Sequence, residues 1–343
     1  MQSRITIQDV ARKAAVSKVT VSYVLNGRDA DARISPETRK RVLDAARDLG
    51  YRPSAIARMM VTQKSATIAV VFQYAQFFSV WSNFISDVMH GVSSAAVDHD
   101  YDLMLHTRAA ATLDEEINQL CDGRVDGALV LRDANDPLTT ALIERNFPSV
   151  LFFTRSYMPG ACFVDADNFA GGRLAARHLL ELGHRDIGMI RGSLNSVSSN
   201  DRFNGYRDAL ESVGLNVNPL HLACVASALH PLDDVEAMLA RKDRPTALFV
   251  WSDDVAHKVL GVITRMGLRV PEDISLVGFD SLETSNICSP PLTSIRQPIV
   301  EMATDATNML VSIINGHTPK KTQLVYPLTL DVRQSTAPID ITS

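Results

Sequence analysis

The sequence lacks the features of membrane, secreted and metal-binding proteins. Its longest apolar runs, such as Val150–Phe153, are far shorter than the roughly 20 residues that a membrane-spanning helix needs. The N-terminus carries Asp9 and no apolar core, so we do not expect a signal peptide. The four cysteines are scattered, with no two at metal-ligand spacing, and we expect them to be small buried residues of a protein kept in the reducing cytoplasm.

The sequence also lacks the motifs of common enzyme classes. No Gly-x-Gly-x-x-Gly or Walker pattern follows an expected strand, and there is no Gly-x-Ser-x-Gly nucleophile elbow. Paired acids occur at Asp233–Asp234 and Asp253–Asp254, but acids adjacent in sequence do not by themselves form a metal site or an acid–base pair. We therefore expect neither enzyme activity nor a bound cofactor or metal.

What the sequence does hold is a strong division of charge. Residues 1–64 contain 13 Lys and Arg against 6 Asp and Glu, a net charge of +7, whereas the rest of the chain carries −12 within the overall −5. A basic segment on an acidic body indicates that an anionic polymer is bound at one end only. A disordered basic tail is the alternative, but this segment has periodic apolar residues and no low-complexity sequence.

Three apolar stripes predict three short helices in this basic segment. The first begins after Thr6, with Asp9 placed to complete a capping box, the second begins after Ser17, and the third begins after Ser35 and ends at Gly50. The positions that these helices are expected to bury are Ile7, Val10, Ala11, Ala14, Val21, Val24, Leu25, Val42, Leu43, Ala46 and Leu49. Two helices joined by a tight turn indicate a helix-turn-helix, whose second helix enters the major groove of DNA.

The outward face of the second helix is suited to reading base edges. Lys18 can donate to guanine, Val19 can pack on a thymine methyl group, and Tyr23 offers a ring and a hydroxyl group. Small polar residues nearby are suited to phosphate contacts, which set register rather than sequence. A solvated face on a protein-interaction bundle is the alternative, and the charge division favours DNA.

Several different short motifs occur in this segment at a characteristic spacing. They are Thr6–Ala11, Ala14–Ser17, Thr20–Ser22, Val24–Gly27, Thr38–Arg39, Val42–Leu43, Ala45–Ala46 and Leu49–Pro53. In combination they resemble the head of the lactose/galactose-repressor family of transcription regulators. Together with the helical pattern, the resemblance implies an all-α helix-turn-helix domain over residues 1–50. The DNA-contacting residues predicted in it are Thr6, Ser17, Lys18, Val19, Thr20, Ser22, Tyr23, Asn26 and Tyr51.

Two departures from the family pattern matter. Ala15 stands in the turn where the family usually has glycine, which costs about 1 kcal/mol if the position needs a positive φ. Tyr23 stands where the family usually has a base-contacting arginine, so the operator sequence is not carried over by the resemblance.

Residues 51–64 are interpreted as a hinge. The segment is helix-prone but too short to be stable alone. The resemblance implies that it folds into a helix only when paired with its dimer mate in the minor groove of DNA. Met60 matches the residue that wedges between base pairs, and Ala57 matches the residue that lies against the groove. A passive linker is the alternative.

From Ser65 onward, short β-branched runs alternate with amphipathic stretches. The expected strands include Thr67–Phe72, Asp102–Leu105, Gly127–Leu131, Val150–Phe153, Ile187–Ile190, Ala247–Trp251 and Ser275–Gly278. The expected helices include Ile85–Val97, Arg173–Leu182, Phe203–Val213 and Val255–Met266. This alternation predicts parallel sheets that bind ligands at the carboxyl ends of their strands. Because about 270 residues exceed one comfortable core, we expect two α/β lobes with a cleft between them.

The body carries further motifs at family spacing: Val125–Gly127, Asp167–Asn168, His178–Leu179, Leu182–His184, Gly205–Tyr206, Ala209–Leu210, Gly267–Ser275, Val277–Asp280, Pro290–Thr293 and Arg333–Thr336. They resemble the same family and imply a periplasmic-binding-protein-like α/β body over residues 65–343, with two Rossmann-like parallel-sheet lobes. The first lobe is expected at about 65–165 and 295–325, and the second at about 166–290 and 326–336.

The resemblance also implies an effector site. Arg202 and Asp280 match the principal effector contacts of the family, and a guanidinium group and a carboxylate facing one cleft suit vicinal hydroxyl groups or a carboxylate ligand. A structural ion pair that closes the lobes is the alternative. Further predicted ligand contacts are Phe84, Ser196, Ser198, Ser252 and Asp253. Other aromatic residues of the same loop that could stack on a sugar, or belong to the core or a lid, are Tyr74, Phe77, Phe78 and Trp81.

The sequence thus predicts a DNA-binding transcriptional regulator, expected to be a repressor, whose operator binding is switched by a small molecule such as a sugar or sugar derivative. Only a short tail without heptads follows Arg333, so we expect a homodimer that reads a pseudo-palindromic operator. Two alternatives stay open: a regulator controlled mainly by a protein partner, and a cytoplasmic ligand-binding protein without operator recognition.

Overall fold

The computed structural model describes residues 5–25, 32–52, 59, 64–73, 82–133, 135–227 and 229–339. The chain divides into two compact units, Met1–Ser65 and Ala66–Ser343, which we call the head and the body. In the described ranges, no helix is both long and apolar enough to cross a bilayer.

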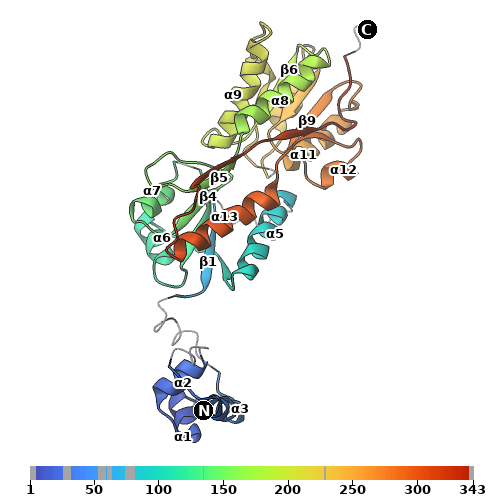
Figure 1. The fold of residues 1–343 in the computed structure, drawn as a ribbon. Helices are drawn as coiled ribbons and strands as arrows, with labels where there is room; N and C mark the ends of the chain where they lie inside the picture. The colour runs from blue at the N-terminus through green and yellow to red at the C-terminus, as the bar shows by residue number, and fades with distance from the viewer. Residues whose placement is uncertain are drawn as a thin grey trace. The chain divides into compact units, whose positions relative to one another are not determined.

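The helices of the head are α1 (Ile7–Ala14), α2 (Lys18–Leu25) and α3 (Pro36–Asp48) (Figure 1). Each begins at the predicted cap. The backbone N–H of Thr6 donates to the Asp9 carboxylate at 3.0 Å, and the hydroxyl groups of Ser17 and Ser35 accept from the backbone N–H three residues on, at 3.0 and 3.2 Å. The buried core of the head consists of Val10, Ala11, Ala14, Val21, Val24, Val42, Ala45 and Ala46.

The turn between α1 and α2 forces Ala15 into the left-handed region, with φ 53° and ψ 47°. An L-residue with a Cβ is disfavoured there, whereas glycine is not. This position therefore does need a positive φ, and Ala15 strains the turn where the family usually has glycine.

The first lobe of the body is built on a six-stranded sheet in the order β11-β5-β4-β3-β1-β2, with every pairing parallel. Its strands are β1 (Thr67–Phe72), β2 (Asp102–Leu105), β3 (Gly127–Leu131), β4 (Ser149–Phe152), β5 (Phe163–Ala166) and β11 (Gln323–Tyr326). Helices cover both faces, which explains the nearly continuous apolar runs of the central strands.

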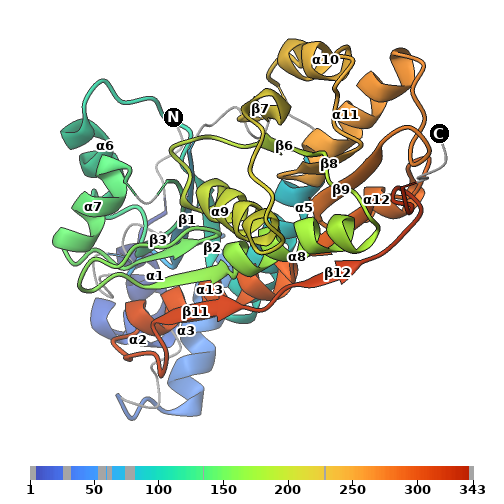
Figure 2. The ribbon, with the colours of Figure 1, turned by 90° about the horizontal axis from the view of Figure 1, so that it is seen from above.

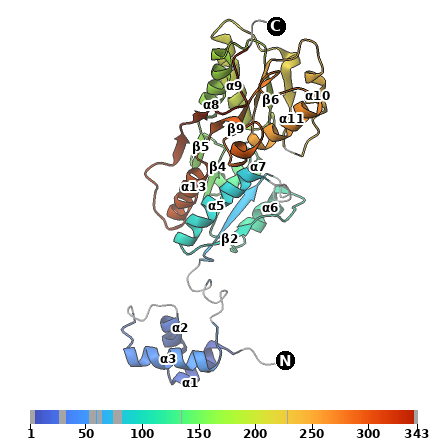
Figure 3. The same cartoon turned by 90° about the vertical axis from the view of Figure 1, so that its right-hand side faces the viewer.

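One face of this sheet is covered by two long helices and the other by two short ones, which can be followed in Figures 1 and 3, two views at right angles. The long pair is α5 (Asn83–Asp98) and α13 (Ile299–Ile314), which lie side by side. The short pair is α6 (Leu113–Leu120) and α7 (Pro137–Glu144).

The second lobe repeats this plan with a six-stranded sheet in the order β12-β10-β9-β8-β6-β7, in which only β12 runs antiparallel. Its strands are β6 (Ile187–Arg191), β7 (Leu222–Cys224), β8 (Ala247–Val250), β9 (Ser275–Asp280), β10 (Thr293–Arg296) and β12 (Thr329–Asp331). The helices on one face are α8 (Asn168–Glu181) and α9 (Val197–Glu211), and those on the other are α10 (Asp233–Leu239) and α11 (Asp253–Arg265). The short helix α12 (Thr284–Ile287) follows β9.

The chain passes between the lobes three times, after β5, after β10 and after β11. Figure 2 shows the last passage, where β11 leads directly into β12 along one edge of the body. The second passage falls after Arg296, because β10 belongs to the second sheet, whereas the sequence placed this boundary at about residue 295.

Helices α8 and α9 pack unusually closely, and glycine makes this possible. A Cβ on Gly172 would lie 2.0 Å from the carbonyl oxygen of Arg202, and a Cβ on Gly205 would lie 2.0 Å from the carbonyl oxygen of Phe169. No real side chain tolerates such a distance to backbone, so the two glycines set the separation of the helices. They also set the position of Arg202.

The cysteines differ from the expectation. All four are free, as expected, but none is fully buried: Cys162 and Cys288 are half-buried, and Cys121 and Cys224 are exposed. Cys121 follows the last residue of helix α6 and Cys224 ends the edge strand β7.

Replacing Gly205 with alanine should destabilise the body. Because the new methyl group meets backbone and not a movable side chain, we expect a loss of about 2–3 kcal/mol in the free energy of unfolding, measured with urea on the full chain. Gly261→Ala in α11 is the control, since only the end of the Arg265 side chain lies near, at 3.8 Å. It should be neutral or stabilising by up to about 1 kcal/mol. Equal losses for the two variants would contradict the packing argument.

Ala15→Gly should relieve the turn strain and stabilise the head by about 0.5–1 kcal/mol. Hydrogen exchange of the α1 and α2 amides in the full chain measures this as slower exchange. Ala11→Gly, inside α1, should accelerate exchange in the same amides, because glycine disfavours a helix interior. Faster exchange in both variants would show that Ala15 is not strained.

Candidate functional site

Two of the predicted DNA-contacting residues, Lys18 and Val19, begin helix α2. Val19 is 63% exposed although it is apolar, and Lys18 beside it is exposed as well. Of the other predicted contacts, Thr6 and Ser17 are exposed, whereas Thr20, Ser22, Tyr23 and Tyr51 are half-buried. The Tyr51 ring packs against the core of the head, so only part of it is available to a partner.

Several predicted residues lie outside the described part of the chain. They are Asn26, Ala57 and Met60 among the DNA contacts, and Tyr74, Phe77, Phe78 and Trp81 in the aromatic loop. Of that loop, the structure describes Phe84.

A cavity of about 430 Å³ lies between the two lobes, at the carboxyl ends of the strands of both sheets. Residues that follow strands supply much of its lining: Gln73 after β1, Asp133 after β3, Thr154 after β4, Ser193 after β6, Trp251 after β8 and Asp280 at the end of β9. Parallel sheets place their loops together in this way, so the topology by itself creates the site.

Arg202 is a buried cation at this cavity, only 6% exposed. Its Nε donates to the side-chain oxygen of Asn168 at 2.8 Å, and Nη1 donates to the carbonyl oxygen of Trp251. Its guanidinium carbon lies 3.5 Å from the centre of the Phe279 ring. Burial lowers the pKa of Arg202 to about 10, so the group still carries its charge at neutral pH.

Asp280 is a buried acid at the same cavity. Its Oδ1 accepts from the Gln297 amide at 2.6 Å, and its backbone adopts φ 116°, a strained value for any residue other than glycine. Burial raises its pKa well above the ordinary value, although the charge of Arg202 opposes this shift. Among the ion pairs of the described residues, none involves Arg202 or Asp280. They therefore do not form the lobe-closing ion pair that was the alternative.

Three predicted serines line the cavity and also have structural contacts. Ser196 and Ser252 cap the N-termini of α9 and α11. The Ser198 hydroxyl donates to the carbonyl oxygen of Phe153 at 3.0 Å, which joins the second lobe to the first. Each of these hydroxyl groups therefore already makes one hydrogen bond within the protein, which limits the bonds that it can make to a ligand.

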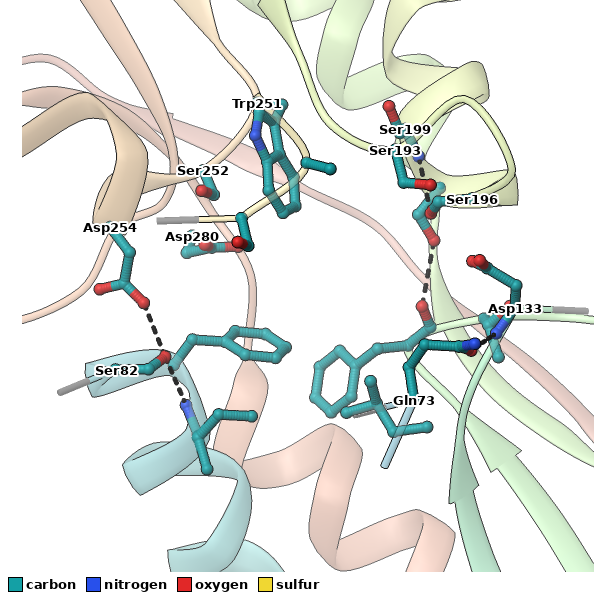
Figure 4. Close-up of a pocket in the computed structure, with 18 of the residues that line it drawn as sticks. Gln73, Ser82, Asp133, Ser193, Ser196, Ser199, Trp251, Ser252, Asp254 and Asp280 are labelled. Carbon is teal, nitrogen blue, oxygen red and sulfur yellow. Dashed lines mark hydrogen bonds between the residues drawn. The ribbon is translucent and has the colours of Figure 1, made fainter. Parts of the chain in front are cut away.

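Asp253, also predicted from the resemblance, does not line the cavity. It is fully buried inside the second lobe, where its carboxylate accepts from the backbone N–H of Leu282 and from the hydroxyl groups of Ser285 and Ser294. The next residue, Asp254, lines the cavity instead and accepts from the Ser82 hydroxyl of the first lobe at 2.6 Å (Figure 4). Helix α11 rotates by about 100° per residue, so neighbouring acids face different environments.

The apolar part of the cavity is aromatic. The rings of Phe84 and Phe153 meet edge to face with their centres 5.0 Å apart. The Trp251 indole N–H donates to the carbonyl oxygen of Val225 at 2.8 Å, which fixes the ring at the cavity wall. In the described ranges, no group of three or more His, Cys, Asp or Glu residues is arranged to hold a metal ion.

An ion-pair network that the sequence did not indicate joins the lobes beside the cavity. Arg155 of the first lobe donates to Asp165 at 2.8 Å and to Asp201, on α9 of the second lobe. Asp165 also accepts from the Asn168 amide at 3.1 Å, and Asn168 in turn accepts from Arg202. Arg155 and Asp201 lie 46 residues apart in the sequence, and Asn168 and Arg202 lie 34 apart. The tertiary fold brings them into one chain of contacts.

Comparison with known proteins accounts for both units. Residues 6–54 match the family model described as "Bacterial regulatory proteins, lacI family". Residues 176–336 match the model of a periplasmic binding protein-like domain. The HTH-type transcriptional repressor PurR of Aliivibrio salmonicida is 34% identical over 320 residues, which cover 90% of this chain and 92% of that protein. PurR of Haemophilus influenzae is 32% identical over 316 residues, covering 90% and 91%. The chain belongs to the lacI family.

Solved structures of the lacI family agree over nearly the whole chain. The transcriptional regulator CelR–cellobiose complex has a TM-score of 0.71 at 32% identity, covering 97% of this chain and 100% of that one. The lac repressor dimer bound to operator and the anti-inducer ONPF has a TM-score of 0.84 at 27% identity, covering 98% and 100%. The prediction of a helix-turn-helix head and a two-lobed α/β body is confirmed. The chain is a DNA-binding transcriptional repressor and not an enzyme.

Asp201→Asn should destabilise the body by about 1–3 kcal/mol, because it leaves the largely buried Arg155 guanidinium with one fewer charged partner. Asp208→Asn is the matched control on the same helix. Its partner Arg173 and Asp208 itself are both about half exposed, so the change should cost no more than about 0.5 kcal/mol. Urea unfolding of the full chain measures both, and similar losses would show that Arg155 does not hold the lobes together.

Proposed function

We propose that this repressor contacts operator DNA through α2 of its head and binds a carbohydrate effector in the cavity of its body. The observation that carries the effector proposal is the arrangement of Arg202 and Asp280, two buried groups of opposite charge that line one cavity without pairing with each other. Vicinal hydroxyl groups suit this arrangement, since a hydroxyl group can accept from a guanidinium group and donate to a carboxylate.

The rest of the cavity supports a carbohydrate. Serine and threonine hydroxyl groups come from both lobes, and the rings of Phe84, Phe153 and Trp251 offer apolar surfaces to the C–H faces of a sugar. A solved relative, the CelR complex, contains cellobiose. The volume of about 430 Å³ lies within the range of small-molecule sites.

For DNA, we propose direct base contacts by Lys18, Val19 and Tyr23, with the other predicted head residues on phosphates. The sequence of residues 51–64 supports a hinge in which Ala57 and Met60 meet the minor groove. A homodimer would then read the two halves of a pseudo-palindromic operator. A solved relative, the lac repressor, is a dimer bound to operator.

The effector would act by linkage. A ligand shifts the affinity for operator only if it binds one arrangement of the protein more tightly than another. Because the cavity is lined by both lobes, a ligand held there would favour one arrangement of the lobes.

A thermal-shift screen of the full chain tests the effector class. The panel contains monosaccharides, disaccharides, sugar phosphates, sugar acids and nucleobases. The carbohydrate proposal expects stabilisation by at least one sugar, since a ligand that binds only the folded state raises its melting temperature. Stabilisation by nucleobases alone would reject the carbohydrate class, and no stabilisation by any compound would favour control by a protein partner.

Arg202→Ala and Lys18→Ala should separate effector binding from operator binding. Arg202→Ala should abolish the stabilisation by the sugar that the screen identifies, with operator affinity in the absence of ligand within about twofold of wild type. Lys18→Ala should cost about 1–3 kcal/mol of operator affinity and relax the preference at one base position, with sugar binding unchanged. Selected operator sites and binding titrations at fixed salt measure both. If Arg202→Ala keeps full ligand binding, the effector site is wrongly assigned.

A further inference from the structure

Polar contacts join the two lobes on both sides of the cavity. On the side of α9, Ser198 binds Phe153, and Arg155 of the first lobe reaches α9. On the other side, at the left of Figure 4, the Ser82 hydroxyl of the first lobe donates to the Asp254 carboxylate of the second at 2.6 Å. We call this second contact the α5–α11 junction. The DNA and effector contacts proposed above give it no role.

Asp254 lies at the start of two helices from different lobes. It belongs to the first turn of α11, and its partner Ser82 is the N-cap residue of α5. The Ser82 hydroxyl accepts from the Ile85 backbone N–H at 3.3 Å while it donates to Asp254. Because the start of a helix carries the positive end of its dipole, both α5 and α11 favour the carboxylate. The contribution of α5 exists only while the lobes keep the observed arrangement.

The α5–α11 junction is half-buried and consists of charged and polar groups. Burial raises the pKa of Asp254, whereas the Ser82 hydroxyl and the Asn83 backbone N–H lower it by stabilising the ionised form. A second, longer hydrogen bond crosses the junction from the Asn83 amide to the Thr284 hydroxyl, at 3.5 Å. If the lobes separated, α5 would lose the carboxylate at its start, so the junction stabilises the observed arrangement.

Asp87, one turn further along α5, opposes this contact. Burial raises the pKa of Asp87, His90 beside it lowers that pKa, and the negative charges of Asp254 and Glu283 raise it. Asp254 and Glu283 belong to the second lobe, so this repulsion acts between the lobes. Like the attraction at Ser82, it is felt only while the lobes meet here.

We propose that Ser82 and Asp254 form a latch that holds the lobes in the observed arrangement, that Asp87 works against it, and that their balance sets operator affinity before any ligand binds. A small molecule shifts a protein between two arrangements effectively only if their free energies are similar, and opposed contacts at one junction keep them similar. The inference uses the linkage of lobe arrangement to operator binding proposed above, and it does not depend on the class of effector.

Hydrogen exchange of the full chain without ligand measures the latch at the first-turn amides of α5. Ser82→Gly removes the donor to Asp254 but keeps a residue type that is favoured at N-caps. Exchange there should quicken about tenfold, the effect of losing a hydrogen bond to a charged group. Thr112→Gly is the matched control, since Thr112 caps α6 of the same lobe by accepting from the Glu115 N–H at 3.2 Å. It should quicken exchange at the start of α6 by no more than about twofold.

Two further variants test the partners of Ser82 and the opposing charge. In an Asp254→Ala background, Ser82→Gly should have no more effect than the control, because the acceptor is already gone. Asp87→Asn keeps the shape of the side chain and removes the repulsion, so exchange in the first turn of α5 should slow by at least about twofold. Asp114→Asn is the same change at a side chain of this lobe that is 86% exposed, and it should leave α5 unchanged.

Operator binding in the absence of ligand tests the regulatory role. The probe is a duplex selected with the wild-type protein and titrated at fixed salt. Ser82→Gly and Asp87→Asn should shift its affinity in opposite directions, each by about threefold or more, because they bias the lobes in opposite senses. Thr112→Gly and Asp114→Asn should match wild type.

The two measurements decide separate parts of the proposal. If Ser82→Gly and Thr112→Gly quicken exchange equally, or if Asp87→Asn also quickens it, the latch is rejected. If exchange changes as expected but operator affinity stays constant, or moves in one direction for both variants, the junction does not regulate operator binding. Neither result bears on the effector class, because no ligand is present. Unchanged exchange in α8 and α9 shows that each variant is folded.

Discussion

Burying the Arg202 guanidinium is the constraint on which the second lobe and the cavity depend. A charge taken out of water is costly unless fixed dipoles and π-systems replace its hydration. Here the replacements come from Asn168 at the start of α8, the carbonyl oxygen that follows β8, and the Phe279 ring on β9. Those contacts require α8 and α9 to approach within the distance that Gly172 and Gly205 permit. One buried cation therefore couples the helix packing to the cavity wall.

The same cation connects the cavity to the junction of the lobes. Asn168 binds both Arg202 and Asp165, and Asp165 binds Arg155, which reaches back to Asp201 on α9. In a low-dielectric setting such a chain of charged hydrogen bonds responds as a unit. A ligand bound beside Arg202, as proposed, would therefore act on groups that join the lobes. This is a physical route from the cavity to lobe arrangement, without any contact between ligand and Arg155.

Local sequence was sufficient for the head and for the central strands of the body. The caps at Thr6, Ser17 and Ser35 act over three residues, so pattern alone located the helix starts. The strands Thr67–Phe72 and Gly127–Leu131 were predicted with the bounds observed, because buried parallel strands are short apolar runs between turn signals. Short edge strands such as β7 and β12 lack that signal, and pairing with a neighbour defines them instead.

The sequence by itself determined that this protein has a basic helix-turn-helix head and a body of alternating strands and helices. Its resemblance to a known family pointed to Arg202 and Asp280, which both line the cavity. Tertiary structure alone decided which polar residues share the cavity. It placed Asp254 and not Asp253 at the wall, since one residue along α11 turns a side chain from solvent to core. It also brought Asp254 of the second lobe to the Ser82 hydroxyl of the first, a contact that depends on how the two sheets are placed and not on any local preference.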